Sequence, residues 1–395
     1  MKKRFLYIVL FVGAIFALSA CSDSIDLDDE QNSYESIAIV YWMGDNSLSS
    51  WAEEDVKELV LGMDNIPTNS KIVIYADKEN AFPVIYQLDA DNGLKIWKEY
   101  AQEEDCTDSL TLLTNLKDII TNFPAKSYGL TFGAHGSGWT WQRRALGPDN
   151  SHSGKWLNIP TLRGVLEQLP HFSYIFFDVC FMQSAEVAFE LRKVADWVIS
   201  SPAEIPNPGA PYHLITEALC KGDVYGIVNG YDSYYPRSYK NPVTQNEQYF
   251  EGVVLSAAKC SEMDSFAATT NRFIKNTFAN RQTISGNTAS RIQKYSSYFS
   301  SYTYCYDVNS AMYNILPAED YSSWAEEFEK AVPLRTSKTG NWTATYCDNP
   351  TIYDSEHFGG ISMYIPKDDY DGNIKNADLK RFQWYKAAGW DQTGW

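Results

Sequence analysis

A histidine and a cysteine each follow a short apolar run of the kind that forms a buried strand. His135 lies in the glycine-rich segment 133–139, directly after the apolar run 128–132, and Cys180 follows the run 174–177. Cysteine is the best nucleophile that a protein offers near neutral pH, and a nearby imidazole can take its proton. These two residues therefore predict nucleophilic attack on a carbonyl carbon, which is the chemistry of acyl transfer.

The elements expected around these residues place them side by side. A helix over residues 159–169 separates the two runs, and a connection of that length typically joins neighbouring parallel strands. In an open parallel sheet, ligands bind beyond the carboxyl ends of the strands. A helix beginning near Gln183 would direct its positive end toward the sulfur and lower the pKa of the thiol. Taken singly, Cys180 is also explained as a small buried hydrophobe, so the prediction depends on the pair.

The pattern from Ser36 to about Pro211 alternates short apolar runs with amphipathic stretches, which is typical of βαβ units. It predicts an α/β/α sandwich with a mainly parallel central sheet, followed by a C-terminal helical addition. The expected strands cover 37–42, 71–76, 84–88, 94–97, 128–132, 174–178, 197–200 and 359–365, and the expected helices include 111–123, 159–169, 183–194, 266–278 and 321–332.

The first residues are typical of a targeting signal. Lys2, Lys3 and Arg4 precede an apolar run of 16 residues, which is shorter than the roughly 20 needed to span a bilayer as a helix. The run ends in Leu-Ser-Ala-Cys, which resembles the bacterial lipobox and predicts lipidation of Cys21. We therefore expect a lipoprotein signal peptide over 1–20, an acidic tether over 21–35, a catalytic core over 36–220, and a C-terminal region with helices and a further sheet strand over 221–395.

The net charge and the spacing of the histidines and cysteines exclude several classes of function. With 33 Lys and Arg against 50 Asp and Glu, the net charge of -17 would repel a phosphate backbone, so nucleic acid is not a partner. The five histidines are scattered, and the five cysteines besides Cys21 and Cys180 have long spacings. No metal site, disulfide framework or cofactor is predicted, and a calcium requirement cannot be read from the sequence.

The order of short motifs resembles the clostripain family of bacterial cysteine peptidases, which have a caspase-like fold. The resemblance covers Ile37 to about Tyr212 and continues near the C-terminus. It rests on Gly-Asp-Asn-Ser at 44–47, Phe-Pro-Ala at 123–125, His-Gly at 135–136 with Gly-Trp at 138–139, Asp-Val-Cys-Phe-Met at 178–182 with Glu-Val-Ala at 186–188, Phe-Gly-Gly-Ile-Ser-Met-Tyr at 358–364, Trp-Tyr at 384–385 and Gly-Trp at 389–390.

The resemblance implies a role for each matched residue. Cys180 would be the nucleophile, His135 the general acid or base, and the backbone N–H groups of Gly136 and Cys180 the oxyanion hole. The sequence departs from the family at Gly133 and Ala134, where bulkier or polar residues are more common, and over 201–206. Both departures concern substrate pockets and leave the two catalytic residues in place.

Acidic residues beside the nucleophile predict the preferred substrate. Side chains alternate along a strand, so Asp178 and Cys180 would project to the same side about 6.6 Å apart. A carboxylate at that distance favours a basic P1 residue, arginine above lysine because its planar fork matches two oxygens. Glu204 is a second acidic candidate. The alternative for Asp178 is that it accepts backbone N–H bonds in the turn.

The loop over 140–158 lies between the two catalytic residues and has the composition of a protease-sensitive segment. Arg143, Arg144 and Lys155 are therefore candidate sites of self-cleavage.

Together, these features predict a lipid-anchored endopeptidase of the bacterial cell envelope, periplasmic or cell-surface, that acts on proteins or peptides with basic residues. The alternative is a catalytically inactive surface lipoprotein that binds peptide or glycan. A glycoside hydrolase would need a pair of carboxylates in one crevice, and the sequence indicates no such pair.

Overall fold

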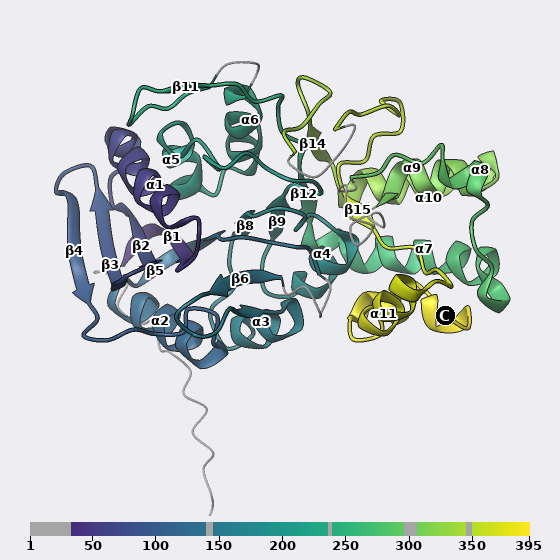
Figure 1. Ribbon diagram of the computed structural model, residues 1–395, viewed down its shortest axis with the longest axis horizontal. Helices are drawn as coiled ribbons and strands as arrows, with labels where there is room; N and C mark the ends of the chain where they lie inside the picture. Colours follow the sequence, from purple (N-terminus) through teal and green to yellow (C-terminus); the bar gives the residue numbers. More distant parts are fainter. Residues whose placement is uncertain (1–32, 140–144, 236–238, 296–305, 345–349) are drawn as a thin grey trace, which may run out of the picture.

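The computed structural model describes residues 33–139, 145–235, 239–295, 306–344 and 350–395. Within these residues the centre of the molecule is a nine-stranded sheet with the order β14-β12-β9-β8-β5-β1-β2-β3-β4 (Figure 1). The strands are β1 (Tyr34–Gly44), β2 (Ser70–Lys78), β3 (Ala81–Asp89), β4 (Gly93–Glu99), β5 (Ala125–Gly133), β8 (Tyr174–Asp178), β9 (Trp197–Ser200), β12 (Leu255–Lys259) and β14 (Leu334–Thr336).

The centre of this sheet is parallel and its edges are antiparallel. Strands β2, β1, β5, β8 and β9 run parallel to one another. The hairpin β3–β4 extends one edge and β12 with β14 extends the other. Because a parallel sheet is covered on both faces, its strands are apolar nearly throughout, and β1 is buried from Ile37 to Gly44. The predicted mainly parallel central sheet is confirmed.

Strand β1 divides its side chains between the two hydrophobic cores, as the alternation of a strand requires. Ile37, Ile39, Tyr41 and Met43 belong to one core. Ala38, Val40 and Trp42, the residues between them, belong to the other. One strand therefore joins both layers of the sandwich to the sheet.

Two sets of helices cover the faces of the sheet (Figure 1). Their apolar stripes supply the buried residues of the two cores. One face carries α1 (Ser49–Leu61), α5 (Tyr212–Lys221) and α6 (Val224–Tyr234), and the other carries α2 (Ser109–Asn122), α3 (Ile159–Leu166) and α4 (Ala185–Leu191). The α/β/α sandwich predicted from the sequence is thereby confirmed.

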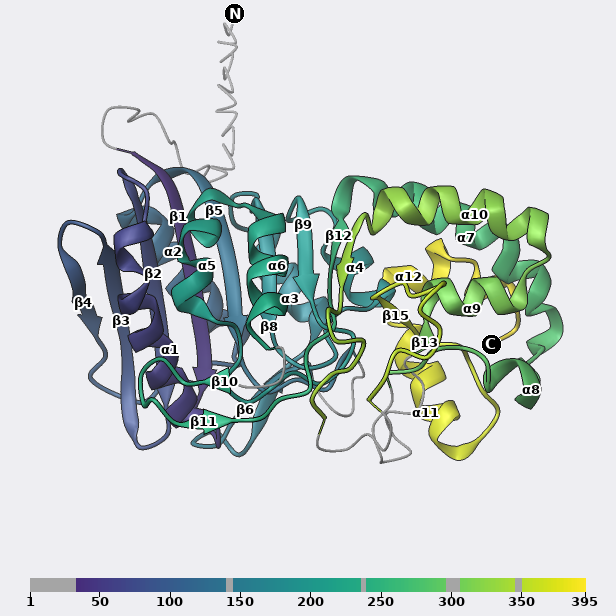
Figure 2. The same ribbon diagram turned by 90° about the horizontal axis from the view of Figure 1, so that it is seen from above.

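The C-terminal helices form a lobe beyond the β12–β14 edge of the sheet (Figure 2). The lobe packs on α4 through α12 and α7. Strands β12 and β14 come from beyond residue 220, so both parts of the predicted division contribute to the sheet. The lobe contains α7 (Met263–Thr277), α8 (Gly286–Ala289), α9 (Val308–Ile315), α10 (Ala318–Ala331), α11 (Tyr370–Leu379) and α12 (Gln383–Ala387).

Short elements complete the described chain. Three small antiparallel pairs join β6 (Leu146–Asp149) to β7 (Lys155–Leu157), β10 (Tyr239–Lys240) to β11 (Glu247–Gln248), and β13 (Tyr306–Asp307) to β15 (Ser362–Met363). Short 3₁₀ turns cover Met63–Asn65, Cys260–Glu262, Ala279–Arg281 and Trp390–Gln392.

The observed elements differ from the predicted ones mainly at helix ends and in the C-terminal region. The helix expected from residue 183 begins at Ala185, because the Ser184 side chain caps it by accepting the N–H of Val187 at 3.2 Å. The strand expected over 359–365 is reduced to β15 and lies outside the main sheet. Strand β12 was not predicted because its sequence, Leu-Ser-Ala-Ala-Lys, has little β-branched or aromatic character.

Every helix in the described part of the chain is too short or too polar to cross a membrane. The predicted signal peptide and Cys21 lie outside the described residues.

Candidate active site

The predicted nucleophile and base lie at the ends of neighbouring strands. Strands β5 and β8 pair in parallel, with Gly133 opposite Asp178. His135 and Cys180 each follow their member of this pair by two residues, so the register carries both to the same level of the sheet edge. The adjacency of these two strands was predicted from the length of the connection and is confirmed.

The loop that carries His135 lies directly on the backbone that carries Cys180. A Cβ atom added to Gly136 would lie 2.1 Å from Val179 Cγ1 and 2.7 Å from the carbonyl oxygen of Cys180. Since Cβ atoms do not approach other heavy atoms this closely, residue 136 must be glycine for the two loops to meet. This contact fixes the separation between the two strand ends.

The β6–β7 hairpin supports the histidine loop from the other side. The Gly147 N–H donates to the His135 carbonyl oxygen at 3.2 Å, and Gly136 and Leu146 form a bridge. Trp139 at the end of the loop is buried with its ring centroid 5.5 Å from that of Tyr364. The histidine backbone is therefore held between β8 and this hairpin.

Ser47 contacts the imidazole of His135 and was not identified as a site residue from the sequence. Its Oγ lies 2.8 Å from His135 Nε2. The turn after β1 is fixed by Asn46, whose amide donates to the carbonyl oxygens of Met43 at 3.0 Å and Pro148 at 2.8 Å. In the sequence the segment 44–47 was one of the motifs of the family resemblance, but Ser47 was given no role because nothing in it pointed to a histidine 88 residues away.

The thiol of Cys180 lies at a sharp turn against the loop that follows β9. The Ile205 N–H donates to Cys180 Sγ at 3.4 Å, and the Phe181 N–H donates to the Ala203 carbonyl oxygen at 2.9 Å. Phe181 has φ +62°, a left-handed conformation that costs a non-glycine residue on the order of 1–3 kcal/mol. Such strain persists only where surrounding contacts hold it.

The segment after the nucleophile is also held by the last part of the chain. The Ser362 N–H donates to the Gln183 carbonyl oxygen at 3.0 Å, and the Tyr364 N–H donates to the buried Glu186 carboxylate at 2.9 Å. In the same way, the Gln383 N–H donates to Glu190 at 2.9 Å. The backbone of the lobe therefore supports α4.

Burial favours the neutral form of both candidate catalytic groups. It raises the pKa of the Cys180 thiol to about 12, with further contributions from the nearby charges of Glu204 and Asp178. It also lowers the pKa of His135 from its ordinary value of 6.5. Burial therefore acts against the lowering of the thiol pKa that we expected from the following helix, the seven-residue α4, which begins only at Ala185.

Asp178 is buried and accepts three hydrogen bonds. Its Oδ2 accepts the Ala210 N–H at 2.8 Å and the Tyr212 hydroxyl at 3.2 Å, and its Oδ1 accepts the Tyr231 hydroxyl at 3.1 Å. Burial raises its pKa to about 6. The hydrogen bond from the Ala210 N–H agrees with the alternative interpretation of Asp178, in which its carboxylate accepts backbone N–H bonds. The donor lies in the loop after β9, however, and not in the turn after β8. Glu204 is also largely buried, in the same loop as Ile205.

Two of the three candidate sites of self-cleavage, Arg143 and Arg144, lie outside the described residues. Lys155 lies in β7, where its side chain is exposed and its Nζ forms an ion pair with Asp105 at 2.8 Å. Its backbone is part of a paired hairpin.

A cysteine and a histidine on adjacent parallel strand ends of an α/β/α sandwich define a caspase-like cysteine peptidase, and the comparisons with known proteins agree. The chain belongs to the clostripain family, whose model matches residues 40–395. It is a cysteine-type peptidase, and its substrates are proteins or peptides.

Solved structures from three bacteria resemble this chain. A secreted C11 cysteine protease from Bacteroides thetaiotaomicron, in complex with an irreversible peptide inhibitor, is 29% identical, covers 90% of this chain and 99% of its own, and has a TM-score of 0.77. An inactive zymogen of a C11 protease from Parabacteroides distasonis is 25% identical, covers 90% and 98%, and has a TM-score of 0.74. A B. fragilis cysteine protease is 31% identical, covers 61% and 96%, and has a TM-score of 0.54. The search of curated proteins gives no match. The predicted family and caspase-like fold are confirmed.

The contact of Gly136 with the Cys180 backbone predicts the effect of one methyl group. Gly136→Ala forces the histidine loop away from β8, and a displacement of about 1 Å costs on the order of 100-fold in rate. We expect kcat/KM for a peptide substrate to fall by about that factor while the circular dichroism spectrum is unchanged. Gly164→Ala is the matched control, because a Cβ atom at Gly164 meets nothing within 4 Å. Equal activity in the two variants would contradict this account of the loop.

Proposed function

We propose that the protein is a cysteine endopeptidase that cleaves after basic residues, arginine more readily than lysine, with Cys180 and His135 as its catalytic dyad. The observation that carries this proposal is the register of β5 and β8, which brings the two residues to one level of the sheet edge. The resemblance to a protease captured with a peptide inhibitor supports the same chemistry.

Because burial favours the neutral form of the thiol and of the imidazole, the proposed mechanism starts from both groups uncharged. His135 accepts the thiol proton as Cys180 Sγ attacks the scissile carbonyl carbon, so that no buried ion pair forms before substrate binds. The backbone N–H groups of Gly136 and Cys180 hold the resulting oxyanion. His135 then returns the proton to the leaving amine, and water hydrolyses the thioester.

Two acidic side chains near the thiol support the preference for a basic P1 residue. The charges of Glu204 and Asp178 both raise the pKa of Cys180, and a cationic P1 side chain would offset this negative charge. Glu204 adjoins Ile205, which contacts the sulfur. Asp178 instead reaches an arginine only by exchanging the hydroxyls of Tyr212 and Tyr231 for the guanidinium.

Fluorogenic peptides that differ only at P1 test this function. We expect the arginyl peptide to be cleaved fastest, the lysyl peptide more slowly, and a leucyl peptide at background. Glu204→Gln should raise KM for the arginyl peptide about 10-fold or more, because a hydrogen bond to a charged group contributes about 1.5–3 kcal/mol. The measurement is the steady-state rate for each peptide.

Two further variants make this result decisive. Cys180→Ala must abolish cleavage of every peptide, and Glu217→Gln, an exposed acid on α5, must leave KM unchanged. Full activity in Cys180→Ala would reject the dyad, and equal cleavage of leucyl and arginyl peptides would reject the specificity. Binding of peptide or glycan by a protein without turnover would favour the inactive lipoprotein.

We further propose that the protein activates itself by cleavage after Arg143 or Arg144. The zymogen form of a related protease supports this idea. On a denaturing gel the full chain should convert to two fragments, whereas Cys180→Ala stays intact. Changing both arginines to alanine should also prevent cleavage, with Lys155→Ala as the matched control because Lys155 lies in a paired hairpin. A fully active single chain would refute self-processing.

Finally, we propose that acylation of Cys21 anchors the protein to the bacterial cell envelope. The short apolar run before this cysteine supports export without a membrane-spanning helix. In fractionated cells, the wild-type protein should sediment with membranes and Cys21→Ser should not. Membrane association of both would exclude this anchor.

A further inference from the structure

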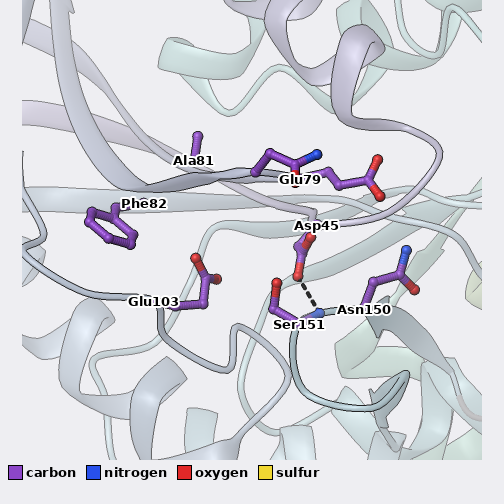
Figure 3. A pocket seen from close by; sticks show the side chains of 8 residues that line it. Asp45, Glu79, Ala81, Phe82, Glu103, Asn150 and Ser151 are labelled. Atoms are coloured by element: carbon purple, nitrogen blue, oxygen red, sulfur yellow. Dashed lines mark hydrogen bonds between the residues drawn. The ribbon is translucent and has the colours of Figure 1, made fainter.

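The turn between β1 and α1 presents Ser47 to the histidine of the proposed dyad and is held on the β6–β7 hairpin. Asp45 Oδ2 accepts the Ser151 N–H at 2.7 Å (Figure 3), and the carbonyl oxygen of Asp45 accepts the Asn150 N–H at 2.9 Å. The buried Asn46 adds its bonds to β1 and to the same hairpin. Because this hairpin also supports the histidine loop, one element holds both partners of the contact between Ser47 and the imidazole.

Ser47 does not have the structural role that a serine close to the start of a helix usually has. Such a side chain normally caps the helix by accepting a backbone N–H. At the start of α1 the cap position is Leu48, and it is Asn46 Oδ1 that accepts the Leu48 N–H, at 2.9 Å. The hydroxyl of Ser47 instead lies 2.8 Å from Nε2 of His135.

His135 differs from the other four histidines in the partner of its ring. Within the described ranges, the one hydrogen-bond partner of the His135 ring is Ser47. A carboxylate favours the charged imidazolium, whereas a hydroxyl holds the ring without adding negative charge. This agrees with the lowered pKa of His135. In each of the other four, a ring nitrogen lies 2.9 Å from a carboxylate oxygen: His152, His171, His213 and His357.

The hydrogen bond at one nitrogen of a neutral imidazole determines what the other nitrogen can do, because the ring carries a single proton. If Nε2 of His135 carries that proton and donates it to Ser47 Oγ, Nδ1 keeps a lone pair and can accept a proton from the thiol. If Nε2 accepts a hydrogen bond instead, Nδ1 is already protonated and cannot act as the base. The two tautomers therefore differ in catalytic competence.

We propose that Ser47 is a positioning residue that accepts the Nε2 proton of His135 and thereby makes Nδ1 the atom that removes the thiol proton. This inference rests on the dyad proposed above and assigns its atoms. As Cys180 Sγ attacks the carbonyl carbon, Nδ1 takes the thiol proton and the ring becomes an imidazolium that is protonated on both nitrogens. Nδ1 then gives this proton to the leaving amine, which restores the starting tautomer.

The hydrogen bond from Nε2 to Ser47 Oγ persists through this cycle but changes in strength. A hydrogen bond with an ionised partner is roughly twice as strong as one between neutral groups. The bond therefore stabilises the charged ring that forms during the reaction more than it stabilises the resting ring, and such differential binding raises kcat rather than lowering KM. Ser47 keeps its own hydroxyl proton throughout, and because its side chain is exposed, water can accept that proton's hydrogen bond.

Steady-state kinetics of the full chain with an arginyl peptide test the positioning role. Ser47→Ala should lower kcat about 10-fold or more, the effect of losing a hydrogen bond to a charged group, and should change KM less than threefold. Ser47→Thr retains a hydroxyl and should recover most of the lost kcat. Ser50→Ala is the matched control, because Ser50 is an exposed serine in the first turn of α1, and it should have the kcat of the wild-type protein.

Nuclear magnetic resonance of ¹⁵N-labelled histidine tests the tautomer without any turnover. In the full chain carrying Cys180→Ala, above the pKa of the imidazole, His135 should have a protonated Nε2 and an unprotonated Nδ1. Its signals are identified by their loss when His135→Gln is added. Adding Ser47→Ala instead should give a mixture of the two tautomers, while the signals of the other histidines stay unchanged.

Two results would overturn this role of Ser47, and a third concerns the dyad alone. A ring of His135 protonated on Nδ1 would reverse the assignment, even if Ser47→Ala loses activity. A kcat in Ser47→Ala equal to that of Ser50→Ala would show that the contact does not act in the reaction. Activity retained in Cys180→Ala would instead reject the proposed dyad, so failure of the dyad is recognised separately from failure of the tautomer.

Discussion

The parallel pairing of β5 with β8 is the constraint on which the rest of the site depends. Once Gly133 is opposite Asp178, the residues two positions further on reach the same edge without any contribution from distant loops. A slip of one residue in a strand turns every side chain to the other face. The two cores that cover the sheet prevent such a slip, so the catalytic geometry derives from ordinary hydrophobic packing.

The surroundings of the site then determine its electrostatics. Removing a thiol and an imidazole from water favours the uncharged form of each, and negative charge beside the sulfur acts in the same direction. Both effects disfavour a thiolate–imidazolium ion pair before substrate binds. In the proposed specificity, a cationic side chain of the substrate would supply positive charge beside the two acids. The same charges around the sulfur therefore affect both the proposed chemical step and the proposed specificity.

Most of the elements and site residues that depend on a local sequence pattern were predicted correctly. The bounds of β8 and β9 follow directly from short apolar runs, and Cys180 and His135 were found because each ends such a run. The features that were not predicted depend on contacts between segments that lie far apart in the sequence. Strand β14 is paired at the sheet edge although its sequence, Leu-Arg-Thr, has only one apolar residue. The contact of Ser47 with His135 joins segments 88 residues apart, and burial raises the pKa of Cys180, against the expected lowering.

The hydrogen bonds from the lobe to α4 have a consequence for biosynthesis. Tyr364 and Gln383 supply them, Ser362 donates to Gln183 just before α4, and all three residues lie far after Cys180 in the sequence. A nascent polypeptide has therefore made its nucleophile long before it has made the supports of the helix that follows it. The site therefore reaches this arrangement only after residues 362–383 have been translated and have packed on α4.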